Sequence, residues 1–403
     1  MRLTRVQIHH YKSLSEVEVE LHPQVTVLVG PNATGKSNFV DALRFMRDAT
    51  RDGLDHAIVA RGGLPRIRQM SSGRPFNVGL AVDALQPSLL KDVGTAPAHY
   101  GFSVCGLTGG NYRVEREIAQ CHEAEWITDE EENDTLGWIF HGFSRDKSGN
   151  VTETHPQPVQ PFTLRDIERL ALGSYAPGLS LHSLCSSLQS YIANWQFTSL
   201  YPNILRQPAT PDTDTQLRED GSNWASVIRA AKRTVRGRRM LERIYEMMRA
   251  VLPGFLDVHV KQTGHYLVPY FRFGDTESSA RLFDPGQLSD GSLRIFGILL
   301  SLYQTPEPAL IVIEEPEQTV HPAVLSVLAE AFKEVSDTTQ VLITTHSPQL
   351  IEHFAPEHIR VVTMPDGMTR ISPLKSSQRE AVQRGLMGLS EFMAAEGLQP
   401  EQP

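Results

Sequence analysis

The chain has 403 residues and a formal net charge of −9, with 40% hydrophobic and 21% charged residues. No stretch approaches the roughly 18 to 20 uncharged apolar residues of a membrane span, which excludes an integral transport role for this chain alone. The first residues lack a secretory apolar core, so we expect a cytoplasmic protein with no membrane partner. The net acidity argues against a uniformly basic protein that coats nucleic acid, although a local basic face remains compatible with it.

The N-terminal segment predicts two strands, a buried strand and a helix, in that order. Apolar residues alternate over 3–9 and 17–21, with 11–15 between them, as in a hairpin. Residues 25–29 form an apolar run typical of a strand buried on both faces. A glycine-punctuated turn over 30–37 then leads to helical spacing over 38–46.

The middle of the chain predicts strands followed by helices. Candidate strands cover 77–82, 99–104 and 112–118. The acidic run that follows is expected to be a solvated loop; its acids are Glu123, Glu125, Asp129, Glu130, Glu131, Glu132 and Asp134. Residues 163–250 look mostly helical, with a loop over 207–215 and a helix start near Asp220.

The C-terminal part predicts alternating helices and strands. We expect helices over 293–303 and 323–332, and strands over 309–313, 340–344 and 359–364. The two ends of the chain then resemble halves of one α/β core. This predicts three domains: 1–75, an inserted β-rich and then helical lobe over 76–285, and 286–403.

One motif indicates a phosphate-binding loop. Gly30–Ser37 fits G-x-x-x-x-G-K-[ST], with a strand before it and a helix after it. Glycines let backbone N–H groups turn toward phosphate oxygens, and the helix directs its positive end at them. Lys36 would neutralise the β- and γ-phosphates and Ser37 would ligate Mg²⁺. The predicted ATP-binding residues are Gly30, Pro31, Asn32, Ala33, Thr34, Gly35, Lys36, Ser37 and Asn38.

Two carboxylates follow the predicted strand 309–313. Glu314 suits a ligand of Mg²⁺, and Glu315 suits a general base that polarises the attacking water. Such paired acids also occur in simple exposed turns, so the assignment depends on the phosphate loop.

Two polar segments are further candidates. Leu288–Arg294 opens an apolar helix whose free N–H groups suit an anion, although an ordinary capped helix explains it as well. His346, after the strand 340–344, suits contact with the γ-phosphate or the water, or is a satisfied histidine at a strand end.

The order of these motifs resembles the ABC-type ATPase heads of the SMC, RecF and OLD group, especially the short AAA-family ATPases without a long coiled coil. The resemblance covers about the first 46 residues and nearly everything after Asp220. It implies an α/β P-loop fold, a mixed sheet flanked by helices, with an inserted helical and β lobe. It makes 30–37 the Walker A loop, 288–294 similar to the signature motif, 311–315 the Walker B strand and His346 similar to the switch histidine. Glu314 stands where many members have aspartate, and neither Gln69 nor Gln120 is assigned as the Q-loop glutamine.

Such heads dimerise around ATP, so the resemblance implies an ATP- and Mg²⁺-dependent homodimer that hydrolyses ATP. The signature residues expected to act in trans are Leu288, Ser289, Asp290 and Gly291. The chain after His346 is too short for an appended nuclease domain of typical size, so we do not expect it to cut DNA itself.

The expected role is that of a DNA-associated sensor or clamp in DNA repair or antiviral defence. A basic cluster is the candidate DNA face, although it also fits a solvated helix; it contains Arg229, Lys232, Arg233, Arg236, Arg238 and Arg239. The alternative is a nucleotide-switched scaffold that assembles a separately encoded nuclease or toxin without acting on DNA.

Overall fold

The computed structural model describes residues 1–69, 76–88, 94–128, 134–154, 162–172, 182–276 and 279–401. The chain divides into two compact units that each combine separate stretches of sequence. The first contains Met1–Pro23, Pro31–Trp195 and Val361–Ser372, and the second contains Gln24–Gly30, Gln196–Arg360 and Pro373–Pro403. Among the described residues, no helix combines the length and apolar character needed to cross a membrane.

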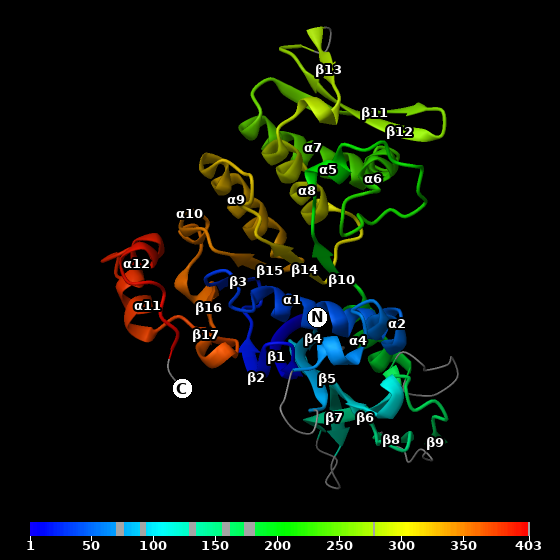
Figure 1. Cartoon of the computed structure of the whole chain (residues 1–403). Coiled ribbons are helices and arrows are strands. Elements are labelled where there is room, and N and C mark those ends of the chain that lie inside the picture. The colour runs from blue at the N-terminus through cyan, green and yellow to red at the C-terminus, as the bar shows by residue number, and fades with distance from the viewer. Residues whose placement is uncertain are drawn as a thin grey trace. The chain divides into compact units, whose positions relative to one another are not determined.

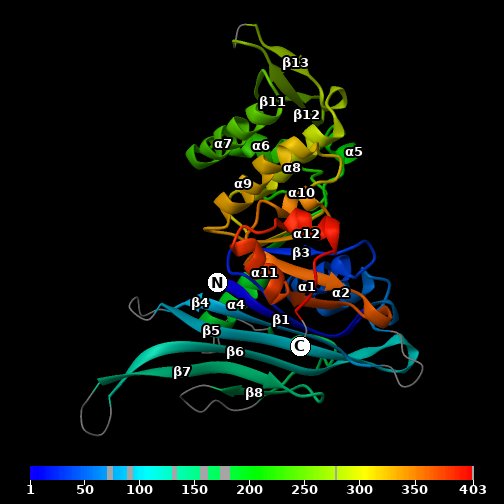
Figure 2. The ribbon, with the colours of Figure 1, turned by 90° about the vertical axis from the view of Figure 1, so that its left-hand side faces the viewer.

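The first unit is built on an antiparallel sheet with the strand order β2-β1-β4-β5-β6-β7-β8-β9. Figure 2 shows its long strands side by side. The strands are β1 (Arg2–Tyr11), β2 (Leu14–Glu20), β4 (Val78–Pro87), β5 (Thr95–Gly106), β6 (Tyr112–Thr128), β7 (Asp134–Arg145), β8 (Asn150–Thr154) and β9 (Phe162–Thr163). The unit also contains α1 (Lys36–Arg51), α2 (Leu54–Val59), α3 (Leu64–Ile67), α4 (His182–Ala193) and most of β17 (Arg370–Pro373).

The second unit contains a largely parallel sheet. In this unit the strand order runs β10 (Trp195–Thr198), β14 (Leu310–Glu314), β15 (Gln340–Thr345) and β3 (Val25–Val29), and β16 (Ile359–Thr363) begins in this unit and ends in the first. All five residues of β3 are buried, as expected for a strand covered on both faces. The helices are α5 (Pro202–Leu205), α6 (Trp224–Ala231), α7 (Val235–Val251), α8 (Asp290–Tyr303), α9 (Leu325–Val335), α10 (Pro348–Ile351), α11 (Ser376–Gln383) and α12 (Leu389–Ala395) (Figure 1).

A small antiparallel sheet completes the second unit. It has the order β11 (Phe255–Thr263), β12 (Tyr266–Phe273) and β13 (Arg281–Phe283). Phe271 of β12 packs against Trp224 of α6 and Phe296 of α8, with ring centroids 6.0 and 5.2 Å apart. These buried rings join the sheet to the two helices.

The structure confirms most predicted elements and corrects three. The hairpin of β1 and β2, the buried strand β3 and the helix α1 all form. The acidic run is not a loop where it is described, because Glu123–Thr128 continues β6; residues 129–133 lie outside the described chain. The helical segment also contains the strand β10, and the helix expected near Asp220 begins at Trp224.

Candidate functional site

The predicted phosphate loop has the backbone of an anion cradle. It joins β3 to the 16-residue helix α1, which begins at Lys36. Gly35 caps the helix with φ +99°, and Ala33 also has a positive φ of 62°. Pro31, Asn32 and Ala33 are exposed. The loop therefore presents the free N–H groups of a helix N-terminus to solvent, which suits the phosphates of a nucleotide.

Side chains inside the loop hold it in this form. The Lys36 ammonium is buried and donates to the carbonyl of Pro31 at 2.9 Å, and the Thr34 hydroxyl donates to the same carbonyl at 2.9 Å. Ser37 is exposed and Asn38 is partly buried. The positive charge that the sequence assigns to the phosphates thus lies within the loop itself.

Thr369, far along the chain, packs against the phosphate loop, and the sequence analysis did not indicate this residue. The Thr369 hydroxyl donates to the carbonyl of Thr34 at 2.9 Å and lies 2.7 Å from the Ser13 hydroxyl, which accepts from the Asn38 amide at 2.7 Å. A Cβ on Gly35 would lie 1.9 Å from Oγ1 of Thr369, so only glycine fits there. No motif surrounds Thr369, which is why only the fold reveals it.

Parallel pairing in the second unit gathers the ends of three strands at one edge. Val29 of β3 pairs with Thr345 of β15, and Glu314 of β14 pairs with Thr344. Gly30, Glu315 and His346 each follow directly after these strands. The start of the phosphate loop, both candidate acids and the candidate histidine therefore leave the sheet at its carboxyl edge, where open α/β sheets bind ligands.

Glu315 lies close to His346 in this arrangement. Oε1 of Glu315 is 3.6 Å from Nδ1 of His346, whose side chain is 44% exposed. Glu315 has φ +46°, a region that non-glycine residues seldom adopt, and its N–H donates to the carbonyl of Thr344 at 2.9 Å. The turn thus holds the carboxylate at the strand end, beside an imidazole open to solvent.

Glu317 is a residue that the sequence left without a role. Its Oε1 accepts from the Thr345 hydroxyl at 2.6 Å and from the backbone N–H of His346 at 3.1 Å, and it lies 3.5 Å from Nδ1 of His346. The Glu317 side chain is only 9% exposed. Its position makes it a positioning residue for the histidine rather than a group that reaches solvent.

Replacing Glu317 by Ala should therefore lower kcat for ATP hydrolysis while ATP affinity stays close to wild type. Losing hydrogen bonds to a buried carboxylate costs about 1.5 to 3 kcal/mol, or about ten- to a hundredfold if His346 acts in the rate-limiting step. Glu317→Gln keeps an acceptor oxygen and should restore most of kcat. Steady-state kinetics of both variants test this, and equal activity of Glu317→Ala and wild type would contradict it.

The predicted signature segment begins helix α8. Ser289 is the N-cap and its hydroxyl accepts from the N–H of Ser292 at 3.2 Å. Ser289 and Asp290 are exposed, and Arg206 pairs with Asp290 at 2.6 Å. Gly291 is buried, and a Cβ there would lie 2.5 Å from the carbonyl of Thr319. The start of the helix is thus fixed by the Arg206 pair and by the close contact at Gly291, while Ser289 and Asp290 remain exposed to solvent.

Arg294 connects the signature helix to the two acids. Its guanidinium is buried and donates to the carbonyls of Glu314 at 3.3 Å, Glu315 at 3.1 Å and Leu200 at 3.1 Å. Burial lowers the pKa of Arg294 from its ordinary value, against the nearby carboxylates of Glu317 and Glu315. The last residue of the predicted signature therefore fixes the backbone of the predicted Walker B turn.

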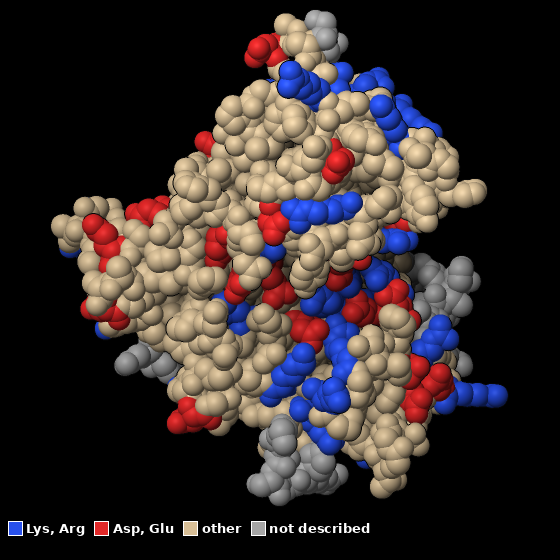
Figure 3. Space-filling view, turned by 45° about the horizontal axis from the view of Figure 1, so that its top comes forward, with Lys and Arg blue, Asp and Glu red and all other residues tan. Residues whose placement is uncertain are grey.

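The basic cluster is not a single uniform face. Arg236 forms an ion pair with Glu307, so the cluster does have an opposing acid. Lys232 is partly buried and donates to the carbonyl of Val258 at 2.7 Å, whereas Arg233, Arg238 and Arg239 are exposed. Figure 3 shows lysine and arginine side chains at the top of that view.

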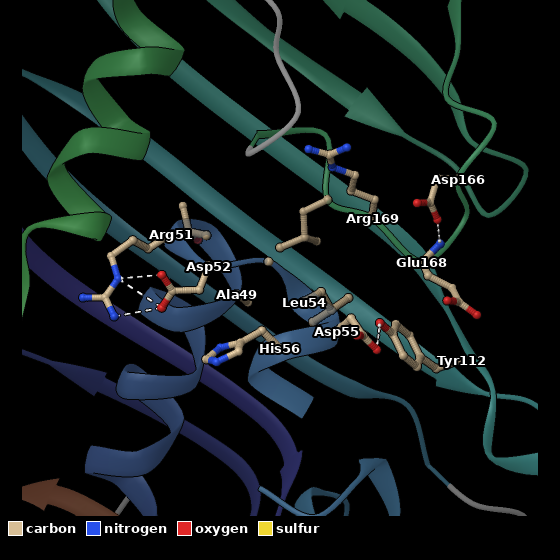
Figure 4. Close-up of a pocket in the computed structure, with 13 residues that line it drawn as sticks. Ala49, Arg51, Asp52, Leu54, Asp55, His56, Tyr112, Asp166, Glu168 and Arg169 are labelled. Atoms are coloured by element: carbon tan, nitrogen blue, oxygen red, sulfur yellow. Dashed lines mark hydrogen bonds and ion pairs between the residues drawn. The ribbon is translucent and has the colours of Figure 1, made fainter. Parts of the chain in front are cut away.

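A hollow in the first unit was not predicted. It encloses about 390 Å³ between the end of α1, the start of α2 and Tyr112 of β6 (Figure 4). The Tyr112 hydroxyl donates to Asp55 at 3.5 Å, and burial together with Asp55, Glu168 and Asp166 raises the pKa of the phenol above its usual range. Arg51, which pairs with Asp52, and Arg169 also line the hollow, so its charge is mixed.

Comparison with known proteins identifies the family. Residues 25–352 match the family described as "AAA domain, putative AbiEii toxin, Type IV TA system". The DNA replication and repair protein RecF of Gloeobacter violaceus is 39% identical over 64 residues, 15% of this chain and 17% of that protein. The chromosome partition protein Smc of Rhodopseudomonas palustris is 45% identical over 51 residues, 12% of this chain and 4% of that protein. The chain thus spans less than a fifth of the length of either relative.

A solved structure agrees in fold. An Smc head bound to the C-winged helix domain of ScpA superposes with a TM-score of 0.53 at 11% identity, covering 94% of this chain and 99% of that one. The predicted α/β fold of the ABC-ATPase type, a mixed sheet flanked by helices, is confirmed. The chain belongs to this AAA-domain family, and its fold is that of the ABC-type ATPase heads of the SMC and RecF kind.

Proposed function

We propose that this ATPase dimerises on binding ATP and acts as a DNA-associated sensor or clamp, in DNA repair or in defence against phage. The observation that carries the proposal is that the first residues of the signature helix are exposed to solvent and held in place by contacts within their own unit. Ser289 and Asp290 are exposed while Arg206 and the tight contact at Gly291 fix them from behind. A helix start built in this way suits an anion supplied from outside its own unit, such as the γ-phosphate of ATP held by a second copy.

The residues present fit a nucleotide with Mg²⁺. Backbone N–H groups of 30–37 and the Lys36 ammonium would bind the phosphates, and the space behind Gly35 admits no side chain. Mg²⁺ prefers oxygen ligands and neutralises charge that develops on the phosphates, for which the Ser37 hydroxyl and the Glu314 carboxylate are the proposed protein ligands. Glu315 would accept a proton from the attacking water, and His346 would orient it.

The proposed domain limits, 1–75, 76–285 and 286–403, assign these parts to the two ends of the chain. We also propose that the chain itself does not cleave DNA.

A second candidate function, the scaffold that assembles a nuclease or toxin, gains support from the family description, which names a putative toxin and a toxin–antitoxin system.

The two functions predict different effects on hydrolysis. If the protein acts on DNA, duplex DNA should raise its ATPase rate at low salt, and the effect should fade as salt rises, because released counterions drive phosphate contacts. A salt series with the untagged protein measures this. Failure to bind DNA at the lowest salt, together with stimulation by a co-purified protein, would instead favour the scaffold.

A further inference from the structure

The hairpin of β11 and β12 leaves one face open to solvent. His259 pairs with Tyr270, Lys261 with Val268 and Thr263 with Tyr266, so these side chains project to the same side. The other side carries Leu267 and Phe271, which are fully buried in the unit. We call the open side the hairpin face; it contains His259, Lys261, Tyr266, Tyr270 and Arg272.

Cations gather at this face. Lys261 is exposed, and its ammonium lies 5.3 Å from the centre of the Tyr270 ring. Lys232 reaches the edge strand at the Val258 carbonyl, and Arg229 lies 3.4 Å from the Gln262 side chain. Within the described chain, none of these three cations forms an ion pair with a carboxylate. Lys232 thus flanks the hairpin face, whereas Arg229 meets Gln262, whose pairing with Leu267 places it on the opposite side of the hairpin.

The surroundings remain positive despite one acid. Asp257 accepts from Arg272 at 2.9 and 2.6 Å and so offsets that guanidinium. Partial burial, and then the charges of Lys232 and Lys261, lower the pKa of His259 from its ordinary value, although Asp257 acts in the opposite direction. Lys232 and Lys261 both lie close enough to His259 to act on its charge.

Aromatic rings lie among these cations. Tyr266, at the hairpin tip, is 52% exposed, and Tyr270 lies beneath Lys261. Phosphates bind the cations, and an unpaired base stacks on an exposed aromatic ring. In a duplex the faces of the bases are covered by stacking, and an acidic protein segment has no base to stack on the ring. Cations beside an exposed aromatic ring therefore fit single-stranded nucleic acid better than a duplex or an acidic protein segment.

We propose that the hairpin face binds single-stranded nucleic acid, with phosphates on Lys261 and Lys232 and a base stacked on Tyr266. This inference rests on the proposed DNA-associated function, because it names the surface and the form of nucleic acid. The proposed nucleic-acid contact is therefore the sheet of β11 and β12 rather than the whole basic cluster on the neighbouring helices.

Fluorescence anisotropy with the full chain tests the inference, using a labelled oligothymidylate of roughly 20 nucleotides and a duplex of equal length. Lys261→Glu should weaken binding of the single strand about tenfold and make its salt dependence shallower. Tyr266→Ala should weaken it by a similar factor, about tenfold, with less effect on the duplex. Basal ATPase activity should stay unchanged in both, which shows that they fold.

Arg384→Glu is the matched control, since it makes the same kind of charge reversal on an exposed side chain of α11's C-terminal end and should leave affinity unchanged. Wild-type affinity in both hairpin variants would overturn the inference while leaving the DNA function intact. Equal loss for single strand and duplex in Lys261→Glu, with no effect of Tyr266→Ala, would also overturn it by showing a purely electrostatic contact. No binding of either probe at low salt would remove the DNA function itself.

Discussion

Lys36→Ala should abolish measurable ATP binding. The Lys36 ammonium lies in the phosphate loop, bound to the Pro31 carbonyl at 2.9 Å, and its side chain is buried. On ATP binding it exchanges that neutral acceptor for phosphate oxygens, so the contact becomes a charge-assisted one. Two such bonds are worth about 3 kcal/mol or more, and their loss should raise Kd for ATP by more than about a hundredfold.

Isothermal titration calorimetry measures the affinity directly. Lys333→Ala is the control, because this lysine lies on α9 with its ammonium 5.9 Å from the Phe354 ring and should leave ATP affinity unchanged. Thermal unfolding of Lys36→Ala should stay near wild type, since alanine suits the first turn of a helix. Unchanged ATP affinity in Lys36→Ala would refute the phosphate-loop assignment.

Local sequence patterns predicted the elements that carry the candidate site. Each part of the site follows a short apolar strand: the loop at 30–37 follows β3, Glu314 ends β14 and His346 follows β15. An apolar run with a polar end is a pattern that a few neighbouring residues are enough to reveal. Parallel pairing then follows from the buried character of the strands. This is why the positions of Glu315 and His346 at strand ends could be predicted from the sequence, whereas the 3.6 Å approach of their side chains is seen only in the structure.

The residues that brace the site were not accessible in this way. Thr369 contacts the carbonyl of Thr34 across 335 positions, and Arg206 pairs with Asp290 across more than eighty. Arg294 was noted only as the end of the signature, although it holds the carbonyls of both acids. Such contacts depend on how distant segments fold together, and single threonines and arginines carry no periodic signal.

The acidic run shows a different kind of limit. Charge density in Glu123–Asp134 indicated a solvated loop, but β6 continues to Thr128 and β7 starts at Asp134. Glu123 pairs with Ile139 and Ala124 with Trp138, so cross-strand pairing outweighs the low strand propensity of glutamate. Tertiary context decided the structure of this segment.

Glu315→Gln should slow hydrolysis without weakening ATP binding. The change keeps the side-chain volume, and the backbone bond to the Thr344 carbonyl at 2.9 Å is untouched, so the turn should keep its form. An amide cannot accept the proton of the attacking water, and loss of a general base typically costs about a hundred- to ten-thousandfold in rate. Glu380→Gln, an exposed acid of α11 beside Arg384, is the isosteric control and should keep wild-type kcat.

The same variant tests dimerisation. If two heads enclose ATP, blocked hydrolysis removes the step that releases them, so the dimer should accumulate with Mg-ATP and disappear when the nucleotide is removed. Multi-angle light scattering at saturating Mg-ATP should then give twice the monomer mass for Glu315→Gln, and the monomer mass for Glu315→Gln combined with Lys36→Ala. A single variant that stays monomeric while it binds ATP normally would rule out the ATP-enclosed dimer. A single variant that hydrolyses ATP at the wild-type rate would instead remove Glu315 as the base and leave the oligomeric state to be judged on the wild-type protein with a non-hydrolysable analogue.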